Sequence, residues 1–233
     1  MRLEAKYMIR KNGKFYKQIS MHKSKFCELP SPVSISDYMT GKMYGIPSIS
    51  TSCLRNDLCL ARMKNGASVC SHCFAETTVR RYTELGKNLE ANFDLLTTSV
   101  LPLSVLPRFK SDVRIARIES FGDVANVTQA INYINIIKVN PHVMFAWWTK
   151  NAKIVGAAIE QVGKPKNVIL VESSEQLNHQ REITDGFDKV FTVYDDNTID
   201  TQKVNVNCGA RSCDTCRRCY SKRTGAVVNE RLK

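Results

Sequence analysis

The sequence of 233 residues lacks the long apolar runs that direct a protein across a membrane or hold it there. Its first residues, MRLEAKYMIRKNGKFYKQ, contain no apolar run of signal-peptide type and no small-residue cleavage site. No later stretch approaches the roughly 20 apolar residues that a membrane-spanning helix needs. We therefore expect a protein that stays in the cytoplasm and has no membrane partner.

The signatures of several common enzyme classes are missing as well. The chain has no GxxxxGK[ST] loop, which argues against nucleotide hydrolysis of the usual kind, and no dinucleotide-binding fingerprint. It shows no recognisable nucleophilic triad. The histidines are too scattered for a zinc hydrolase: His22, His72, His142 and His179.

Cysteine is the residue type that carries the clearest chemical signal, because the chain has nine. A chain of this length with 43% hydrophobic residues can bury a core without covalent crosslinks. In a reducing cytoplasm, grouped cysteines predict metal sites before they predict disulfides. The odd number of cysteines agrees with that interpretation.

Four cysteines fall within twelve residues near the C-terminus, with the spacing C-x4-C-x2-C-x2-C. They are Cys208, Cys213, Cys216 and Cys219. Short CxxC loops let successive thiolates converge on one centre while the intervening backbone amides point at the sulfur atoms. This spacing is typical of segments that bind iron–sulfur cubanes, although four close cysteines can also bind zinc. We expect a [4Fe-4S] cluster here, with zinc as the alternative.

A second group of cysteines lies in the first third of the chain, with the looser spacing C-x5-C-x10-C-x2-C. Its members are Cys53, Cys59, Cys70 and Cys73. They supply either a four-cysteine site or three ligands with Cys53 spare. The CxxC pair leads into a predicted helix, whose dipole favours negative charge at its N-terminus.

The roles of His72 and Cys27, and the number of metal sites, are also predicted from the sequence. His72 lies inside the CxxC loop and is expected to point outward. Cys27 lies far from both groups in the sequence and is expected to be an unligated thiol, although it could replace Cys53. Two independent metal centres are the simpler interpretation, but cysteines from both groups could also share one site.

The net charge of +12 is concentrated at the two ends of the chain. Residues 1–25 carry a net charge of +7 and residues 217–233 carry +5, so the 191 residues between them are neutral. Clustered cations indicate contact with nucleic acid or another polyanion, because binding releases counterions. They could equally serve solubility, or compensate the negative metal–thiolate groups that a formal charge count omits.

The pattern of apolar residues predicts an α/β fold. Asn12-Gly13 predicts the turn of a hairpin with strands at 6–10 and 14–20, so that residues 1–43 form a basic β-hairpin and linker. Residues 44–233 form the metal-cluster domain, in which a long helix at 74–98 precedes alternating elements. We expect strands at 113–118, 143–148, 168–171 and 189–194, with helices at 124–139 and 151–162 and a weaker helix at 175–183.

Strands that alternate with helices form parallel βαβ units with a buried sheet. The expected architecture is therefore a partial (β/α) barrel or a small parallel sheet, which the run 46–51 could extend. Trp147 and Trp148 follow each other on one strand, so they should face opposite sides of the sheet.

The carboxyl ends of the predicted strands are polar, and in such folds function gathers there. Glu119 and Asp123 follow the first of these strands and are acid/base or ligand-contact candidates. Lys150 follows the second and is a candidate anion contact. Each one taken singly has a structural explanation as well, since Asp123 could simply cap the next helix.

Several sequence blocks in matching order, over roughly residues 44–220, resemble a bacteriophage family named gene product eighty-eight. The blocks are Cys70-Ser-His-Cys73-Phe-Ala, RIESFGD at 117–123, FAWWTK at 145–150, VFTVYD at 190–195 and the terminal run from Cys208 to Tyr220. The family is in turn distantly similar to radical S-adenosylmethionine (SAM) enzymes, with cysteines before a helix, a partial barrel, and more cysteines after it. In those enzymes three cysteines hold a [4Fe-4S] cluster whose open iron binds SAM. The resemblance therefore implies cluster binding, and SAM as a further ligand near Glu119–Asp123.

Three functions follow from these features. The first is a phage-type iron–sulfur protein of the host cytoplasm, with two clusters and a redox or radical-SAM-like role at the polar strand ends. A non-catalytic electron carrier or redox sensor acting on a protein partner is the second. The third, from a different class, is a zinc-stabilised protein that binds nucleic acid through its basic ends.

Overall fold

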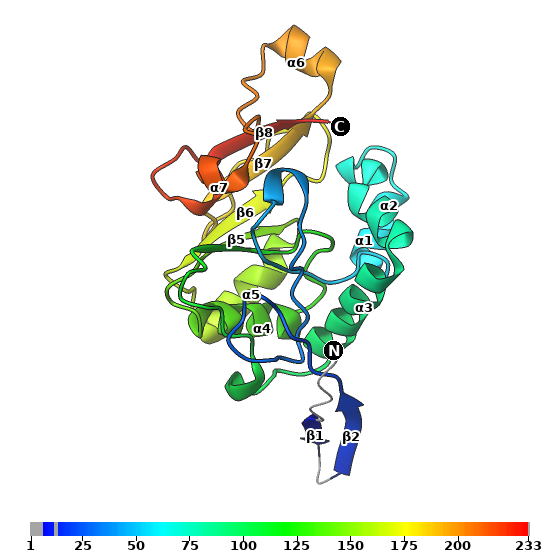
Figure 1. The fold of residues 1–233 in the computed structure, drawn as a ribbon. Coiled ribbons are helices and arrows are strands. Elements are labelled where there is room, and N and C mark those ends of the chain that lie inside the picture. Colours follow the sequence, from blue (N-terminus) through cyan, green and yellow to red (C-terminus); the bar gives the residue numbers. More distant parts are fainter. Residues whose placement is uncertain (1–6, 12–13, 233) are drawn as a thin grey trace.

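A parallel sheet of six strands forms the centre of the molecule in the computed structural model, which describes residues 7–11 and 14–232 (Figure 1). The strands of this sheet are β3 (Ser48–Ile49), β4 (Ile115–Ile118), β5 (Met144–Thr149), β6 (Val168–Ser173), β7 (Lys189–Tyr194) and β8 (Val227–Arg231). Each strand lies beside its neighbour in the sequence, and every pair is parallel. This winding is that of a (β/α) barrel, but β3 and β8 do not pair. The expected partial α/β fold is confirmed.

The helices differ in length and lie mostly before β4 or between the strands. The α-helices are α1 (Asp57–Met63), α2 (Phe74–Arg81), α3 (Thr83–Thr98), α4 (Val127–Lys138), α5 (Ala152–Val162), α6 (Asp196–Gln202) and α7 (Cys213–Cys216). Short 3-10 helices are η1 (Gly41–Met43), η2 (Val69–His72), η3 (Leu103–Val105) and η4 (Arg218–Tyr220). Within the described part of the chain, no helix is both long and apolar enough to cross a membrane.

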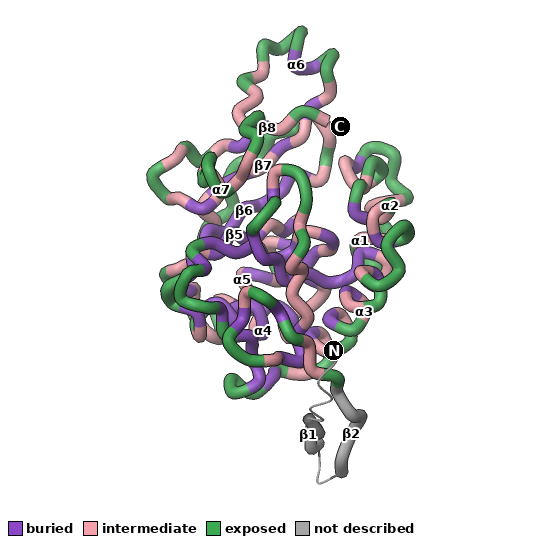
Figure 2. The backbone as a smooth tube through the Cα atoms, in the orientation of Figure 1, coloured by how far each residue is buried: buried purple, intermediate pink, exposed green. Residues whose placement is uncertain are grey.

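One face of the sheet, called here the helix face, packs against α4 and α5 and holds the main hydrophobic core. Phe145 and Trp147 of β5 point into this core, where Trp147 meets the ring of Tyr133 from α4 edge-on at 5.4 Å between centroids. The strands and α4 are accordingly the most buried parts of the backbone (Figure 2). The apolar strand runs seen in the sequence are thus explained by burial beneath helices.

The opposite face, called here the cavity face, is covered differently. Met43 and Tyr220 pack against Ile115 and Ala146 in a separate, smaller cluster that also includes Trp148. The predicted placement of the two tryptophans on opposite faces is confirmed. In the described part of the chain, residues near η1 and the C-terminal segment with η4 cover this face, in place of long helices such as α4 and α5.

The N-terminal hairpin forms as expected, with β1 (Tyr7–Lys11) antiparallel to β2 (Lys14–Ile19). Its predicted turn, Asn12-Gly13, lies outside the described residues. The division of the chain after residue 43 stays a prediction. Cys27 and Val33, in the predicted linker, are buried in the main core.

The single helix predicted at 74–98 is wrong in one respect, because Tyr82 breaks it into α2 and α3. The backbone of Tyr82 leaves the helical region, with φ −110° and ψ 86°. The break lets α3 fold back closely on α2: a side chain at Gly86 would stand 3.2 Å from the carbonyl oxygen of Val79. Apolar spacing continues across the break, so periodicity alone gave no sign of it.

The weak helix predicted at 175–183 is also wrong. The segment is irregular: Gln176 forms an isolated bridge with Ser68, and Asn178 has φ +62°. The backbone N–H of Asn178 donates to Val193 and its side chain bonds Asp195, so tertiary contacts use the groups that a helix would pair.

Two elements near the C-terminus were not predicted. Strand β8 pairs with β7 from Val190↔Val227 to Tyr194↔Arg231. Helix α6 is capped by Asp195, whose side chain accepts from the N–H of Thr198. The apolar run of β8 is only Ala226-Val227-Val228 within a polar tail, too short to indicate a strand by itself.

Candidate functional site

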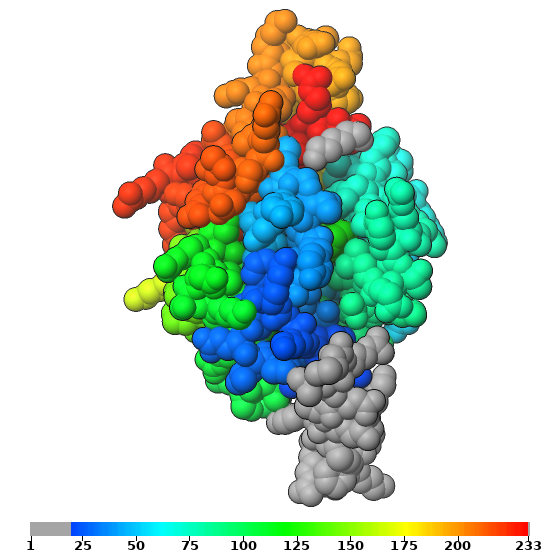
Figure 3. All heavy atoms as spheres, viewed as in Figure 1, coloured from blue at the N-terminus to red at the C-terminus, as the bar shows by residue number. Residues whose placement is uncertain are grey.

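A cavity of about 1590 Å³ lies on the cavity face and at the carboxyl ends of β4 and β5. Eight of the nine cysteines line it; only Cys27 does not. Residues 34–43 run between the C-terminal segment and α2–α3, and they line the cavity between the two cysteine groups (Figure 3). The fold therefore brings both cysteine groups, 135 residues apart between Cys73 and Cys208, to one space.

The N-terminal cysteines occupy four consecutive elements. Cys53 follows β3, Cys59 lies in α1, Cys70 lies in η2, and Cys73 is the residue that caps the N-terminus of α2. The predicted position of this CxxC pair at a helix N-terminus is confirmed. Cys53 is 2% exposed and packs with Leu89 and Phe121, so this group is attached to a hydrophobic cluster of its own.

Polar caps hold the loops between these cysteines in place. The Asn56 side chain caps α1 through the N–H of Leu58, and its amide donates to the carbonyl of Asp123 at 2.7 Å. The Ser68 hydroxyl accepts from the N–H of Cys70 at 3.1 Å. The last residue of the x10 loop, Val69, donates its N–H to the carbonyl of Glu175 after β6 at 2.8 Å, so this loop is tied to a strand end.

The electrostatic environments of these thiols differ. A hydrogen bond with the thiol of Cys53 lowers the pKa of Cys73 to about 6. The backbone N–H groups of Glu76 and Ala75, at the start of α2, act in the same direction. Desolvation raises the pKa of Cys59 strongly, with the carboxyl groups of Asp123 and Glu119 adding to it.

The C-terminal cysteines are held on the cavity face by β8 and η4. The N–H of Cys208 donates to the carbonyl of Asn229 in β8 at 2.9 Å. Cys213 and Cys216 are the two ends of α7, and Cys219 lies in η4 beside Tyr220, whose ring stands 6.5 Å from that of Trp148. Desolvation raises the pKa of Cys219 to about 12.

Cations surround this second group. Lys42 Nζ lies 2.9 Å from the carbonyl oxygen of Cys208, 3.7 Å from its Sγ and 2.9 Å from Glu230 Oε1. The guanidinium carbon of Arg117, in β4, lies 3.7 Å from the centre of the Trp148 ring, and the charge of Arg117 acts on Cys213 and Cys219. Sequence reasoning missed Lys42 and Arg117, since neither stands near a cysteine in the chain.

Glu119, a predicted acid/base candidate, lines the cavity but is 2% exposed and fully hydrogen-bonded. Its carboxylate accepts from the Thr51 N–H at 3.1 Å and hydroxyl at 2.7 Å, from Gln129 at 2.9 Å, and from the Tyr133 hydroxyl. Desolvation raises the pKa of Glu119 to about 7. Its backbone has φ +59°, a strained conformation for this residue type. Through these contacts Glu119, which follows β4, links helix α4 to the segment after β3 that leads to Cys53.

Asp123, the second candidate, joins the ends of two strands. It accepts from the N–H of Val124 at 2.8 Å, the Thr149 hydroxyl at 2.6 Å and the N–H of Lys150 at 2.9 Å. The alternative role as a helix cap is not observed, since Asn126 caps α4. Arg62, which sequence reasoning missed, lies 3.6 Å from Asp123.

Lys150, the predicted anion contact, lines the cavity near the N-terminal thiols, where its charge opposes the rise in the pKa of Cys59. Among the described residues its ammonium group has no hydrogen-bonding or ion-pair partner. His72, in η2, is exposed, as expected for a residue that points outward. The structure thus places Glu119, Asp123 and Lys150 at one cavity, with only Lys150 free to meet a ligand.

The described residues contain no group of three or more His, Cys, Asp or Glu side chains that could hold a metal ion as they stand.

The family model described as gene product 88 matches residues 9–230, so the chain belongs to that phage family, as the sequence blocks predicted. No curated protein and no solved structure matches the chain. The more distant resemblance to radical SAM enzymes is therefore not supported by these comparisons.

Proposed function

We propose that this member of the gene product 88 family is an iron–sulfur protein of the host cytoplasm, with one cluster for each cysteine group. One observation carries the proposal: eight of nine cysteines line one cavity in two groups of four, although the chain has no need of crosslinks. Four cysteine thiolates are the ligand set of [2Fe–2S] and [4Fe–4S] clusters. Cys27, the ninth, is buried away from the cavity in the main core.

The donor groups fit a cluster in kind and number. Cys53, Cys59, Cys70 and Cys73 would hold one cluster, and Cys208, Cys213, Cys216 and Cys219 the other. A bound cluster supplies one-electron transfer at a potential set by hydrogen bonds and solvent exposure. The chain contributes the N–H groups at the start of α2 on one side, and Lys42 with Arg117 on the other.

A radical-SAM-like role is the finer form of the proposal. The partial barrel and the position of the N-terminal cysteines at its strand ends support it. We expect SAM, added to the reduced protein, to change the paramagnetic signal of the N-terminal cluster if this role is correct. An unchanged signal at saturating SAM would leave electron transfer or redox sensing as the function.

The test is metal and acid-labile sulfide analysis, with an absorption spectrum, of protein purified without oxygen. We expect brown protein with iron and sulfide in comparable amounts. Replacing Cys70 and Cys73 by serine should remove about half of the iron, and replacing Cys213 and Cys216 should remove the other half. Cys27→Ser is the matched control and should keep all of it. Colourless protein that holds zinc and no sulfide would overturn the proposal.

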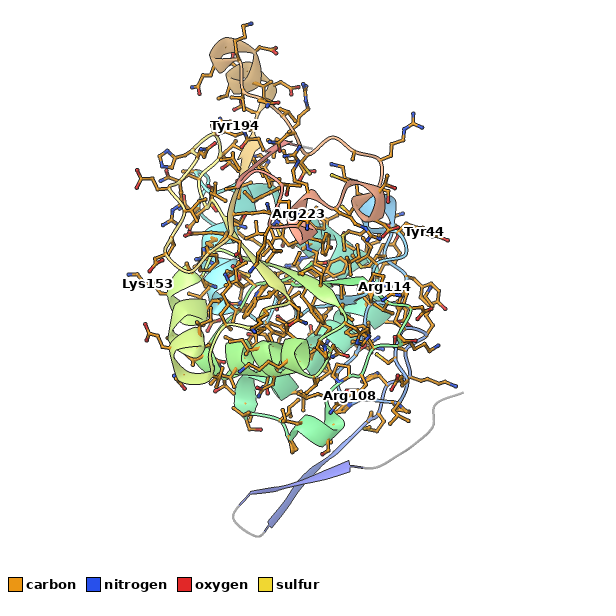
Figure 4. All side chains as sticks on the ribbon, turned by 90° about the vertical axis from the view of Figure 1, so that its left-hand side faces the viewer. Tyr44, Arg108, Arg114, Lys153, Tyr194 and Arg223 are labelled. Atoms are coloured by element: carbon orange, nitrogen blue, oxygen red, sulfur yellow. The ribbon has the colours of Figure 1, made fainter. Side chains whose placement is uncertain are left out.

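The second candidate, a zinc-stabilised nucleic-acid-binding protein, is favoured by one feature. Four exposed cations flank the C-terminal cysteines: Arg211, Arg217, Lys222 and Arg223, the last of which is labelled in Figure 4. Such cations could contact phosphates. Zinc content together with DNA or RNA binding that weakens steeply with salt would establish this function.

A further inference from the structure

Arg117 is a cation that lacks a compensating anion on the cavity face. It extends from the middle of β4 into the cavity, and its Nε is buried without a hydrogen-bond partner in the described part of the chain. No hydrogen bond or ion pair of its guanidinium to any other described residue is formed. Arg117 as a whole is half-buried, and burial of its Nε without a partner is costly unless an acceptor meets it.

The acids that line the same cavity are already engaged: Asp37 accepts from Ser24 and from the N–H of Lys25, and Glu84 pairs with Lys87. Glu119 accepts four hydrogen bonds from Thr51, Gln129 and Tyr133, and Asp123 accepts three. Glu230 pairs with Lys42 at 2.9 Å. None of these carboxylates is therefore left to compensate Arg117.

The thiols nearby supply no direct hydrogen bond. The charge of Arg117 favours the anionic form of Cys213 and Cys219, but its guanidinium forms no hydrogen bond with either sulfur among the described residues, unlike Lys42 with Cys208. The buried Nε of Arg218 is likewise without a partner and lines the same cavity. Two arginines whose Nε has no hydrogen-bond partner among the described residues, Arg117 and Arg218, thus line the same cavity.

Trp148 fixes the orientation of Arg117. The guanidinium carbon lies 3.7 Å from the centre of the indole ring, so the ring covers one side of the group. This contact uses none of the guanidinium N–H groups, and their planar fork is suited to bind carboxylate and phosphate oxygens in pairs. The cavity, at about 1590 Å³, exceeds the volume of most single-ligand pockets.

We propose that this cavity binds a ligand through an anionic group, a carboxylate or a phosphate, held by the edge of Arg117 while Trp148 covers its face. Lys150, which lines the same cavity, is a second cation for a ligand that carries more than one such group. The site lies between the two cysteine groups. It does not require a cluster, because the cation, the aromatic ring and the cavity belong to the chain itself.

The test is titration calorimetry of the full chain, purified without oxygen, with pyrophosphate, succinate and the neutral analogue succinamide at constant ionic strength. We expect saturable binding of at least one anion and none of succinamide. Tighter binding of pyrophosphate would identify a phosphate ligand, and tighter binding of succinate a carboxylate ligand.

Tryptophan fluorescence provides a second, local measurement. We expect the bound anion to change the emission of Trp148, because the only other tryptophan, Trp147, is buried on the helix face. The fluorescence change should disappear in Trp148→Phe.

Arg117→Gln should weaken anion binding by about tenfold or more, and Arg117→Lys, which keeps the charge but loses the planar fork, by less. The matched control is Arg114→Gln, because Arg114 is an exposed arginine just before the same strand (Figure 4). Circular dichroism would show that each variant is folded. Binding that is absent, or that Arg114→Gln weakens as much as Arg117→Lys and Arg117→Gln do, would overturn the proposal. Iron and sulfide measured on the same samples test the cluster separately.

Discussion

In the N-terminal cysteine group Cys53 is 2% exposed and packs with Val79, Leu89 and Phe121, whereas in the C-terminal group Cys216 is exposed at the end of α7. The N-terminal group is built into the start of the barrel, between β3 and the helices that follow it. The C-terminal group lies on a segment laid across the cavity face, anchored by Tyr220 (Figure 1).

The charges around the two groups are mixed in sign but differ in balance. Carboxyl groups of Asp123 and Glu119 outweigh Lys150 at Cys59, while Arg117 and Lys42 outweigh Glu230 at Cys213. The two groups thus differ in burial at one thiol each, because Cys53 is buried, Cys216 is exposed and the other six thiols are intermediate. We expect this difference to control how fast each group exchanges metal with solvent.

The largest effect is expected from Gly122→Ala, at the base of the N-terminal group. An added Cβ would lie 2.5 Å from the carbonyl oxygen of Thr51 and 3.1 Å from Glu119 Oε2, so the backbone leading to Cys53 must shift. We expect a loss of about 3 kcal/mol in the free energy of unfolding, measured with denaturant. Iron loss confined to the N-terminal group should accompany it.

Gly156→Ala is the matched control for that substitution. Gly156 lies within α5, and nothing approaches its added Cβ within 4 Å. Alanine in a helix interior should stabilise the protein by up to about 1 kcal/mol. Equal destabilisation by the two substitutions would contradict the role assigned to the close approach of Gly122 to Thr51.

The next effect concerns pH and Glu119. Because burial raises its pKa from 4.5 to about 7, the folded state binds this proton more tightly than the unfolded state does. This contribution to stability is complete below pH 4.5 and is lost as the pH rises through 7, by roughly 3 kcal/mol. Glu119→Gln should remove that decline from the free energy of unfolding measured between pH 4.5 and 8. The exposed Glu160→Gln on α5 should leave the decline in place.

Metal removal compares the two groups directly. An excess of chelator should bleach the protein in two phases, with the exposed C-terminal group losing iron about tenfold faster than the enclosed group. Cys216→Ser should abolish the fast phase and leave the slow one. A single phase, or survival of the fast phase in that variant, would show that the two groups are not distinguished by burial.

The smallest effect is expected from Lys42→Met, which removes the contact of Lys42 with Cys208 and Glu230. Both side chains of the ion pair are about a quarter exposed, so we expect a cost of about 1 kcal/mol or less in stability. The fast phase of iron loss should quicken by two- to threefold at most. Lys87→Met, which breaks an exposed pair with Glu84, is the control and should change neither quantity measurably.

Much of the parallel sheet was predictable because its strands are continuous apolar runs that alternate with helical patterns. β4, β5, β6 and β7 all appear near their expected positions, and α5 ends at Gly163 with φ +75°. β8 was not predictable, because its few apolar residues stand in a charged tail and become a strand only by pairing with β7. The break at Tyr82 was hidden for a related reason, since both helices bury residues at the same spacing.

For the candidate site, the grouping of the cysteines and the polar strand ends were visible in the chain. What each polar residue does was not, because Glu119 and Asp123 are satisfied by hydrogen bonds from Thr51, Tyr133 and Thr149. Spacing along one segment cannot reveal partners that come from other elements.

The sequence by itself determined the phage family, the α/β class and the two sets of four thiols, because composition, periodicity and local spacing are properties of single segments. Only the tertiary structure decided that both sets line one cavity, that Cys53 is buried while Cys216 is exposed, and that Arg117 lies over Trp148 without an ion-pair partner among the described residues. The physical reason is that burial and charge compensation depend on which distant segments meet, and the winding of the parallel sheet brings them together.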